Sequence, residues 1–290
     1  MADASRAHRL FVSPTVLAVI VLGAYPLLFM LAASLTESSL GRPFASFTGG
    51  ENFATVLADG DVVASVVRTV VYALAVSVAS VALGVIVALA LVHATRAGSL
   101  VRTLLLLPII TPPVVVGTLW KLVFNPGGGL IDAILRGFGA EPASFAPLSS
   151  SFWALPAIGM ADVWQWTPLV TLLVYAALLT QDRSAREAAA LDGAHGFGFF
   201  RHITWPAIAG TVVAVFLIRL VIALKVFDLV FVMTSGGPGQ ATTTTSYLIY
   251  QIALKEFDVG RASAVTLIFA VVVTLIAAPI AMIARRTSHE

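Results

Sequence analysis

Six long apolar runs dominate this chain and restrict the folds that it can adopt. They cover roughly residues 10–34, 63–92, 100–123, 152–180, 207–234 and 260–284. Each is long enough for an α-helix to cross the hydrocarbon core of a bilayer, which takes roughly 20 residues. Charged residues make up only 11% of the chain, whereas soluble domains carry about 25%. We therefore expect an all-α polytopic membrane protein with six transmembrane helices, partnered by the lipid bilayer.

The arginines predict the orientation of these helices. Loops on the cytoplasmic side of a membrane carry an excess of lysine and arginine. Most arginines outside the runs lie at the two termini or in the second and fourth connections: Arg6, Arg9, Arg96, Arg102, Arg183, Arg186, Arg201, Arg285 and Arg286. Both termini and the connection 181–206 are therefore expected in the cytoplasm. We divide the chain into a first helix with its outer loop, 1–62, and a core transmembrane domain, 63–285.

The sequence carries no pattern typical of an enzyme active site. It contains no cysteine, which excludes disulfides and thiolate metal sites. It has no phosphate-binding loop of the form Gly-x-x-x-x-Gly-Lys-[Ser/Thr], no His-Glu-x-x-His zinc helix and no Gly-x-Ser-x-Gly elbow. We predict no catalytic residue, no metal, no cofactor and no nucleic-acid partner.

The fourth connection has the signals of a short helix. Ser184 stands three residues before Glu187, as in a capping box. An alanine-rich turn follows, and Gly193 can supply the left-handed residue that ends a helix. Pro206 suits the first turn of the next helix. We expect a short helix between two spans, with small residues that another protein can approach closely.

Prolines interrupt the third run, in the segment Leu107–Pro113. A proline inside a helix removes a backbone donor and kinks or breaks the helix. In lipid the freed carbonyls need partners from neighbouring helices, hydroxyls or water. Two interpretations stay open: a tolerated kink, and a hinge or break that lines a cavity.

The fifth run contains three charged residues, Arg219, Lys225 and Asp228. Inserting a charged side chain into the middle of a membrane span costs about 3 kcal/mol of free energy, so the charge needs a partner or water. Lys225 and Asp228 are three residues apart and can meet on one face of a helix, whereas Arg219 lies on a different face from Asp228. These residues either line a polar path or form pairs that tie helices together.

The fourth run contains Asp162, Gln165 and two tryptophans, Trp164 and Trp166. Indoles beside hydrogen-bonding groups suit a sugar, which has an apolar C–H face and a rim of hydroxyls. The alternative is an aromatic belt at the membrane interface next to a capped helix end.

The polar stretch in the fourth connection also resembles a family motif. Glu187-Ala-Ala189, Asp192-Gly-Ala194 and Ile203-Thr-Trp205-Pro206 are similar, with the same spacing, to the cytoplasmic motif Glu-Ala-Ala, Asp-Gly-Ala, Ile-x-Leu-Pro. This motif belongs to the inner-membrane permease subunits of bacterial ABC importers. A second set of residues resembles the first permease of the pair in the maltose-type and glycerol-phosphate-type sugar branch: Phe227-Asp228, Thr234–Pro238, Tyr250 and Phe257.

The resemblance implies the type I ABC importer permease fold in the bacterial inner membrane. A second homologous permease would complete the passage for a sugar or related solute, two ATPase subunits would hydrolyse ATP, and an extracytoplasmic solute-binding protein would deliver the solute. The coupling helix would be Glu187–Gly193, seated in a cleft of one ATPase. The residues implied in this coupling are Glu187, Ala188, Ala189, Asp192, Gly193 and Pro206.

Two other functions are compatible with the residues. An ion-coupled secondary carrier would use the charged residues of the fifth run, and a membrane enzyme would use Asp162 as acid or base. For transport, the residues expected along the translocation pathway or at the substrate are Asp162, Gln165, Trp166, Arg219, Lys225 and Asp228.

Overall fold

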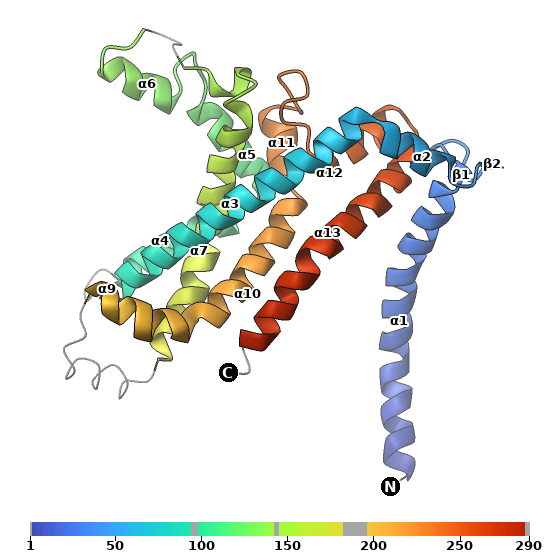
Figure 1. Ribbon diagram of the computed structural model, residues 1–290, viewed down its shortest axis with the longest axis horizontal. Coiled ribbons are helices and arrows are strands. Elements are labelled where there is room, and N and C mark those ends of the chain that lie inside the picture. Colours follow the sequence, from blue (N-terminus) through green and yellow to red (C-terminus); the bar gives the residue numbers. More distant parts are fainter. Residues whose placement is uncertain (1, 94–97, 142–144, 182–195, 288–290) are drawn as a thin grey trace. The chain divides into compact units, whose positions relative to one another are not determined.

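The computed structural model describes residues 2–93, 98–141, 145–181 and 196–287 (Figure 1). Within these residues, five helices are long and apolar enough to cross a membrane, and a bent pair of helices makes a sixth span. The five are Val12–Ser34, Gly60–Val92, Ala154–Leu179, Gly196–Leu224 and Val259–Met282, and the bent pair is Thr103–Ile110 with Pro113–Val123. The predicted all-α polytopic fold is confirmed.

The chain divides into two compact units, residues 1–64 with 248–271, and residues 65–247 with 272–290. The division predicted from sequence, 1–62 and 63–285, stays a prediction. The first unit contains α1 (Ala2–Ser34), β1 (Thr36–Glu37), β2 (Ser46–Phe47), α2 (Glu51–Ala58), the π-helical turn η3 (Gln251–Lys255) and the first part of α13 (Val259–Thr287). The two strands pair antiparallel.

The first unit is held together by apolar packing and by one asparagine. Val56, Val62, Ile252 and Val265 belong to its buried core. The Nδ2 of Asn52 donates to the carbonyl oxygens of Ser34 (2.9 Å) and Thr36 (3.0 Å). These carbonyls lie where α1 ends and have no partner within that helix. Asn52 therefore secures the turn after the first span.

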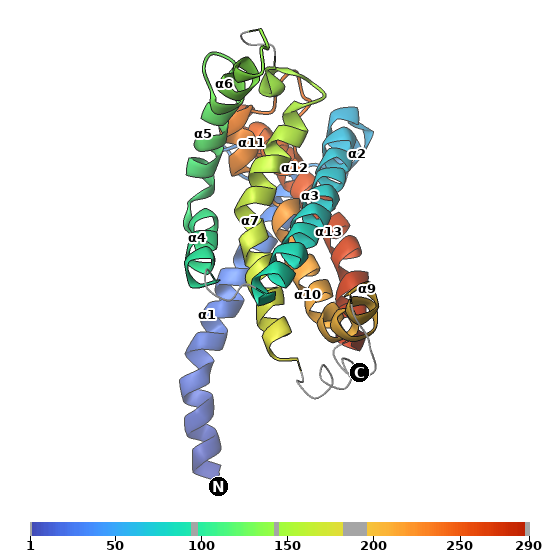
Figure 2. The same cartoon turned by 90° about the vertical axis from the view of Figure 1, so that its left-hand side faces the viewer.

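The second unit contains the other spans. It includes α3 (Gly60–His93) from residue 65 onward and the start of α12 (Thr245–Tyr250). Its other elements are α4 (Gly98–Ile110), α5 (Pro113–Val123), α6 (Leu130–Gly137), the 3-10 turn η1 (Pro147–Ser149), α7 (Ala154–Leu179), α9 (Gly196–Phe199), the π-helical turn η2 (Phe200–Thr204), α10 (Trp205–Leu224) and α11 (Asp228–Met233). Figure 2 shows α7 between α3 and the pair α4–α5.

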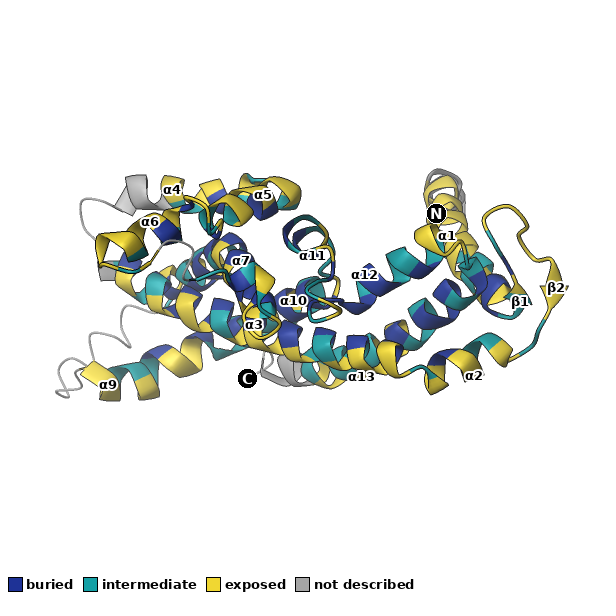
Figure 3. Ribbon diagram, turned by 90° about the horizontal axis from the view of Figure 1, so that it is seen from above, coloured by how far each residue is buried: buried dark blue, intermediate teal, exposed yellow. Residues whose placement is uncertain are grey.

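Three helices of the second unit share one apolar core. Val85 from α3, Val174 from α7 and Val212 from α10 are among its buried members. By contrast, most described side chains of α1 are exposed and yellow in Figure 3, and only 6% of its span is buried within the chain. Exposed apolar side chains on such helices suit contact with lipid, whose tails are as apolar as leucine.

A glycine lets α3 and α7 approach closely. A Cβ placed on Gly84 would lie 2.5 Å from Val170 Cγ1. Small residues at helix contacts are typical of membrane proteins because association there depends on close packing. Replacing Gly84 by alanine is therefore expected to destabilise the protein by about 1–3 kcal/mol through overpacking.

The matched control is Gly23→Ala in α1, where a new Cβ meets nothing within 4 Å. The apparent melting temperature of each purified variant in detergent measures the effect. Equal melting temperatures for the two variants would contradict the proposed contact.

The first and last residues of the fifth span differ from those predicted. The sequence predicted residues 207–234, whereas the helical span begins at Gly196 and ends at Leu224. At its start, α9 and the π-helical turn η2 lead directly into α10. At its end, residues 225–227 leave the helix before α11 begins at Asp228. An apolar run cannot reveal this interruption, because the same residues suit a continuous helix.

Candidate functional site

Two interrupted spans meet at one cavity in the second unit. The axes of α4 and α5 are bent by 100° at their break. The second break lies between Leu224, the last residue of α10, and Asp228, the first of α11. A cavity of about 250 Å³ is lined by Pro113 from the first break and by residues 225–227 from the second. Non-helical backbone at membrane depth is tolerated where it is buried in protein or lines a cavity.

The first break is stabilised by a residue from another helix. Gln165 of α7 donates from Nε2 to the carbonyl oxygen of Thr111, at 3.1 Å. The Thr111 hydroxyl donates to the carbonyl oxygen of Leu107, at 2.7 Å. Both carbonyls face the interruption and gain partners from an amide and a hydroxyl. Of the two interpretations of the proline segment, the structure supports a break that lines a cavity.

The second break places opposite charges at the two helix ends that favour them. Lys225 follows the last residue of α10, and Asp228 is the first residue of α11. Cations are favoured at helix C-termini and anions at N-termini. The Thr244 hydroxyl donates to the carbonyl oxygen of Val226 at 3.2 Å, which satisfies the unwound backbone. Both charged residues line the cavity.

The predicted pairing of Lys225 with Asp228 on one helix face is wrong. The helix is interrupted between them, so the three-residue spacing does not bring them together. Among the ion pairs of the described residues, none joins these two side chains. Each instead lines the cavity separately.

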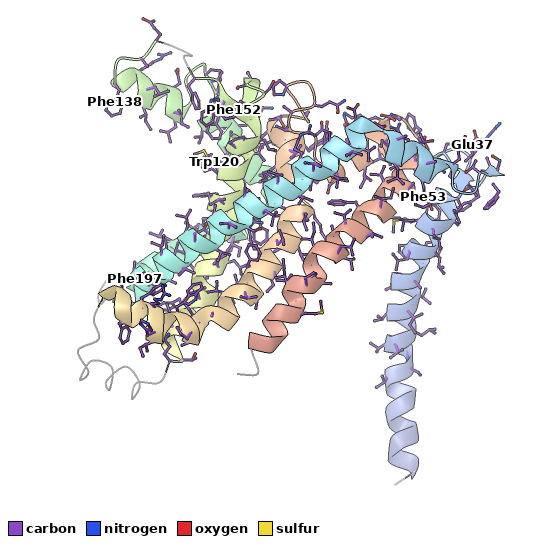
Figure 4. All side chains as sticks on the ribbon, in the orientation of Figure 1. Glu37, Phe53, Trp120, Phe138, Phe152 and Phe197 are labelled. Carbon is purple, nitrogen blue, oxygen red and sulfur yellow. The ribbon has the colours of Figure 1, made fainter. Side chains whose placement is uncertain are left out.

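Helix α7 supplies three further lining residues, Asp162, Gln165 and Trp166. Their spacing places them on one helix face. Trp164 lies elsewhere and packs edge-on against Trp120, with ring centroids 6.1 Å apart; Figure 4 labels Trp120. The idea that both indoles flank one ligand is therefore wrong, because residues two apart on a helix do not face the same way. Of the two tryptophans, only Trp166 lines the cavity.

Arg219 is completely buried and does not line the cavity. Its Nη2 lies 2.8 Å from Asp162 Oδ2, and its Nε donates to Ser80 Oγ at 3.3 Å. The Tyr72 hydroxyl donates to the same Asp162 oxygen at 2.9 Å. The arginine thus connects α3, α7 and α10 through a buried ion pair. For this residue the geometry matches the interpretation that charged pairs tie helices together.

Arg219 also supports the cavity wall. Its Cζ lies 5.9 Å from the centroid of the Trp166 ring, within range of a cation–π interaction. Gln165 Oε1 is buried and has no hydrogen-bond partner within the described protein. Buried acceptors without a protein partner commonly bind water or ligand groups. The cavity therefore combines one indole, one free amide acceptor and two separate charges.

A larger cavity, of about 640 Å³, lies at the ends of α5 and α11. Lys121, Asn125, Ser149 and Pro238 are among its lining residues. Lys121 donates to the carbonyl oxygen of Val232 at 3.2 Å and is otherwise exposed. The smaller cavity is the better candidate site, because both broken spans and the buried ion pair meet there.

Most of the predicted coupling residues lie outside the described residues. These are Glu187, Ala188, Ala189, Asp192 and Gly193, so the predicted short helix stays a prediction. Pro206, the last residue of the motif, is described and is the second residue of α10, in the first turn as predicted. It stands within a longer helical segment that begins at Gly196.

Broken spans that meet at a polar cavity are an architecture of membrane transport proteins. Residues 80–289 match the family described as the binding-protein-dependent transport system inner membrane component. The chain belongs to this family. It is therefore a multi-pass membrane component of a transport system and not an enzyme, as the sequence predicted.

Relatives with similar sequences are permeases. The chain is 34% identical over 272 residues to the probable ABC transporter permease protein y4oQ of Sinorhizobium fredii, covering 93% of this chain and 87% of the relative. It is 32% identical over 256 residues to the trehalose/maltose transport system permease protein MalF of Thermococcus litoralis, covering 87% and 85%. The comparisons give no support to the alternative of an ion-coupled carrier.

A solved structure shows the same fold. The chain superposes with a TM-score of 0.85 on a chain from the crystal structure of a bacterial ABC transporter involved in the import of the acidic polysaccharide alginate. The match covers 98% of both chains at 21% sequence identity. The predicted ABC importer permease fold is confirmed.

Proposed function

We propose that this chain is one of two homologous permeases of an ATP-driven importer for a sugar or a related hydroxylated solute. Two ATPase subunits supply the energy, and an extracytoplasmic solute-binding protein delivers the solute. The family name supports dependence on a binding protein, and the relatives named as ABC permeases support the ATPase partners. The trehalose/maltose permease relative supports a sugar as the solute.

The observation that carries this proposal is the cavity where the two broken spans meet. At about 250 Å³ it lies just below the ~300–1,000 Å³ of typical small-molecule sites. A single permease thus supplies part of a solute site, and a second permease facing it supplies the rest. We place the translocation pathway along this cavity.

The chemistry of the cavity suits an uncharged solute. Asp162 is neutralised by Arg219, and the charges of Lys225 and Asp228 have opposite sign. Sugar hydroxyls can donate to Asp228, and they can accept from Lys225. The indole of Trp166 offers an apolar face for a sugar ring. No net charge is left to favour an anion or a cation.

A continuous helix connects the cavity with the proposed ATPase contact. The segment Gly196–Leu224 has 29 residues and so spans roughly 40 Å. It begins next to the coupling residues 187–193, and it ends at Lys225 on the cavity. Arg219 in the same helix is bonded to α7 and α3. A push on the cytoplasmic end can therefore shift one wall of the cavity as a rigid lever.

Reconstitution tests this proposal. Proteoliposomes containing this chain with its partner permease and ATPases should take up a labelled sugar such as maltose or trehalose only with ATP and the binding protein present. Uptake by the isolated chain, driven by an ion gradient without ATP, would overturn it.

The cavity charges are tested by Asp228→Asn and Lys225→Met. Losing a hydrogen bond to a charged group costs about 1.5–3 kcal/mol, so sugar uptake at limiting concentration should fall at least about tenfold. Basal ATP hydrolysis should stay unchanged. Lys255→Met is the matched control, because this exposed lysine does not line the cavity. Normal uptake by both cavity variants would remove these residues from the pathway.

A further inference from the structure

Helix α6 exposes apolar side chains that no part of the described chain covers. It follows α5 and stands out to the side of the helices of its unit in Figure 1. Leu130 is 59% exposed, Ile134 is 50% exposed, and Phe138, directly after the helix, is 88% exposed. Residues four apart lie on the same face of a helix. The three side chains therefore form a continuous apolar stripe, and Figure 4 labels Phe138 at its end.

The polarity of α6 is reversed relative to a helix on the surface of a soluble protein. Its acidic residue, Asp132, is only 4% exposed, whereas Leu130, Ala133, Ile134 and Gly137 are exposed. Asp132 Oδ2 lies 3.1 Å from Arg136 Nε, so the carboxylate is neutralised on the side away from the stripe. A surface helix in water normally turns its apolar face inward and its charges outward. The outward apolar face of α6 therefore requires an apolar environment.

A tight turn at residues 125–129 holds the start of α6 close to the end of α5. Gly129 donates its N–H to the carbonyl oxygen of Asn125 at 2.8 Å, and Gly127 donates to Asn125 Oδ1 at 3.0 Å. A Cβ on Gly129 would lie 2.5 Å from the carbonyl oxygen of Leu122. Leu130 therefore begins α6 within a few ångströms of the last turn of α5.

The surroundings of α6 are those of a membrane boundary. Leu119 and Leu122, in the last turns of α5, are exposed apolar residues. Phe152 and Trp153 are exposed just before α7 begins. Exposed aromatic residues at span ends are typical of the membrane–water interface. The apolar stripe of α6 therefore follows directly after exposed apolar residues at the end of α5.

We propose that α6 is an interfacial helix, with Leu130, Ile134 and Phe138 inserted into the lipid bilayer at the headgroup boundary. The Asp132–Arg136 pair faces the protein and the headgroups. Amphipathic helices bind in this way when one face is apolar and lies parallel to the membrane. Through the turn at 125–129, α6 fixes the depth of α5 beyond its break from α4. This role does not depend on which solute is transported.

Lipid fits the stripe better than a protein partner does. The stripe itself contains only apolar side chains, and Arg136 beside it, with its side chain 49% exposed, suits the headgroup region. Interfaces between separately folded proteins are about as polar as the rest of the surface and have a polar rim. A docking surface for a soluble binding protein would therefore carry a rim of polar groups, whereas Arg136 is the one exposed polar side chain within α6.

Nitroxide labelling tests this inference directly, because the chain contains no cysteine. Single variants Ile134→Cys and Phe138→Cys are labelled in the complete transporter in proteoliposomes. Collision rates are measured with oxygen, which concentrates in lipid, and with a water-soluble nickel complex. Leu22→Cys on α1, 75% exposed in a span that is only 6% buried, is the lipid control, and Glu141→Cys, an exposed residue after α6, is the water control.

We expect the ratio of oxygen to nickel collisions at 134 and 138 to be several-fold higher than at 141 and to approach that at 22. A ratio at 134 and 138 equal to that at 141 would overturn the proposal. Low access to both reagents would show that another subunit covers the stripe, and would also overturn it. Immobilisation of the labels only after addition of the binding protein would assign the stripe to that partner instead.

Discussion

Replacing Arg219 by leucine is expected to destabilise the protein by about 3–5 kcal/mol, because Asp162 would keep a buried charge without its partner. Asp162 is 3% exposed, and Arg219 Nη2 is its ion-pair partner at 2.8 Å. Tyr72 donates one hydrogen bond to the same carboxylate, which offsets only part of the loss. The apparent melting temperature of the purified protein, followed by tryptophan fluorescence, should fall markedly.

A double variant separates the ion pair from simple loss of packing. Replacing both Arg219 and Asp162 by leucine removes both buried charges, and such replacements are often neutral or stabilising. We therefore expect the double variant to recover most of the stability that Arg219→Leu loses. Lys225→Leu, at an exposed position outside the pair, should change the melting temperature little. A double variant as unstable as the sum of the two single variants would contradict a coupled pair.

Replacing Glu187 by lysine is expected to lower solute-stimulated ATP turnover and uptake by more than about tenfold, because a reversed charge at a protein contact costs several kcal/mol. This prediction rests on the proposed coupling helix 187–193. Assembly of the variant with its partner subunits is measured by co-purification, and ATP hydrolysis is measured with and without the loaded binding protein.

The matched control is Glu141→Lys, the same charge reversal at an exposed residue that the orientation predicted from the arginines places on the opposite side of the membrane. Its ATP turnover and uptake should equal those of the unchanged protein. If the Glu187 variant assembles and transports normally, the coupling assignment fails, although the chain remains a member of the same family.

Local sequence signals identified the elements of the site better than their arrangement. The prolines of Leu107–Pro113 predicted a kink or break, and α4 and α5 are bent by 100° there. Nothing in the sequence indicated that Gln165 would donate to the Thr111 carbonyl, since they are 54 positions apart. The interruption at 225–227 was missed because the apolar run continues on both sides of it and contains no proline or glycine there. A lysine and an aspartate three apart were its only signal.

The same contrast holds for the charged residues. Their cost in lipid made Arg219, Lys225 and Asp228 candidates, but the sequence left open whether they form a path or tie helices together. The structure separates them: Arg219 pairs with Asp162 across two helices, whereas Lys225 and Asp228 line the cavity. Side-chain direction at a broken helix depends on backbone angles that residue spacing cannot supply.

The sequence by itself determined that the chain is a polytopic helical membrane protein of an importer family, because length and hydropathy decide which segments enter lipid and the motif at 187–206 is specific. Only the tertiary structure decided that two broken spans share one cavity, that Arg219 supports its wall, and that α6 turns its apolar face outward. These features depend on contacts between residues distant in the chain. Hydropathy is a property of each segment alone, whereas a cavity and an ion pair between helices exist only once the segments have packed.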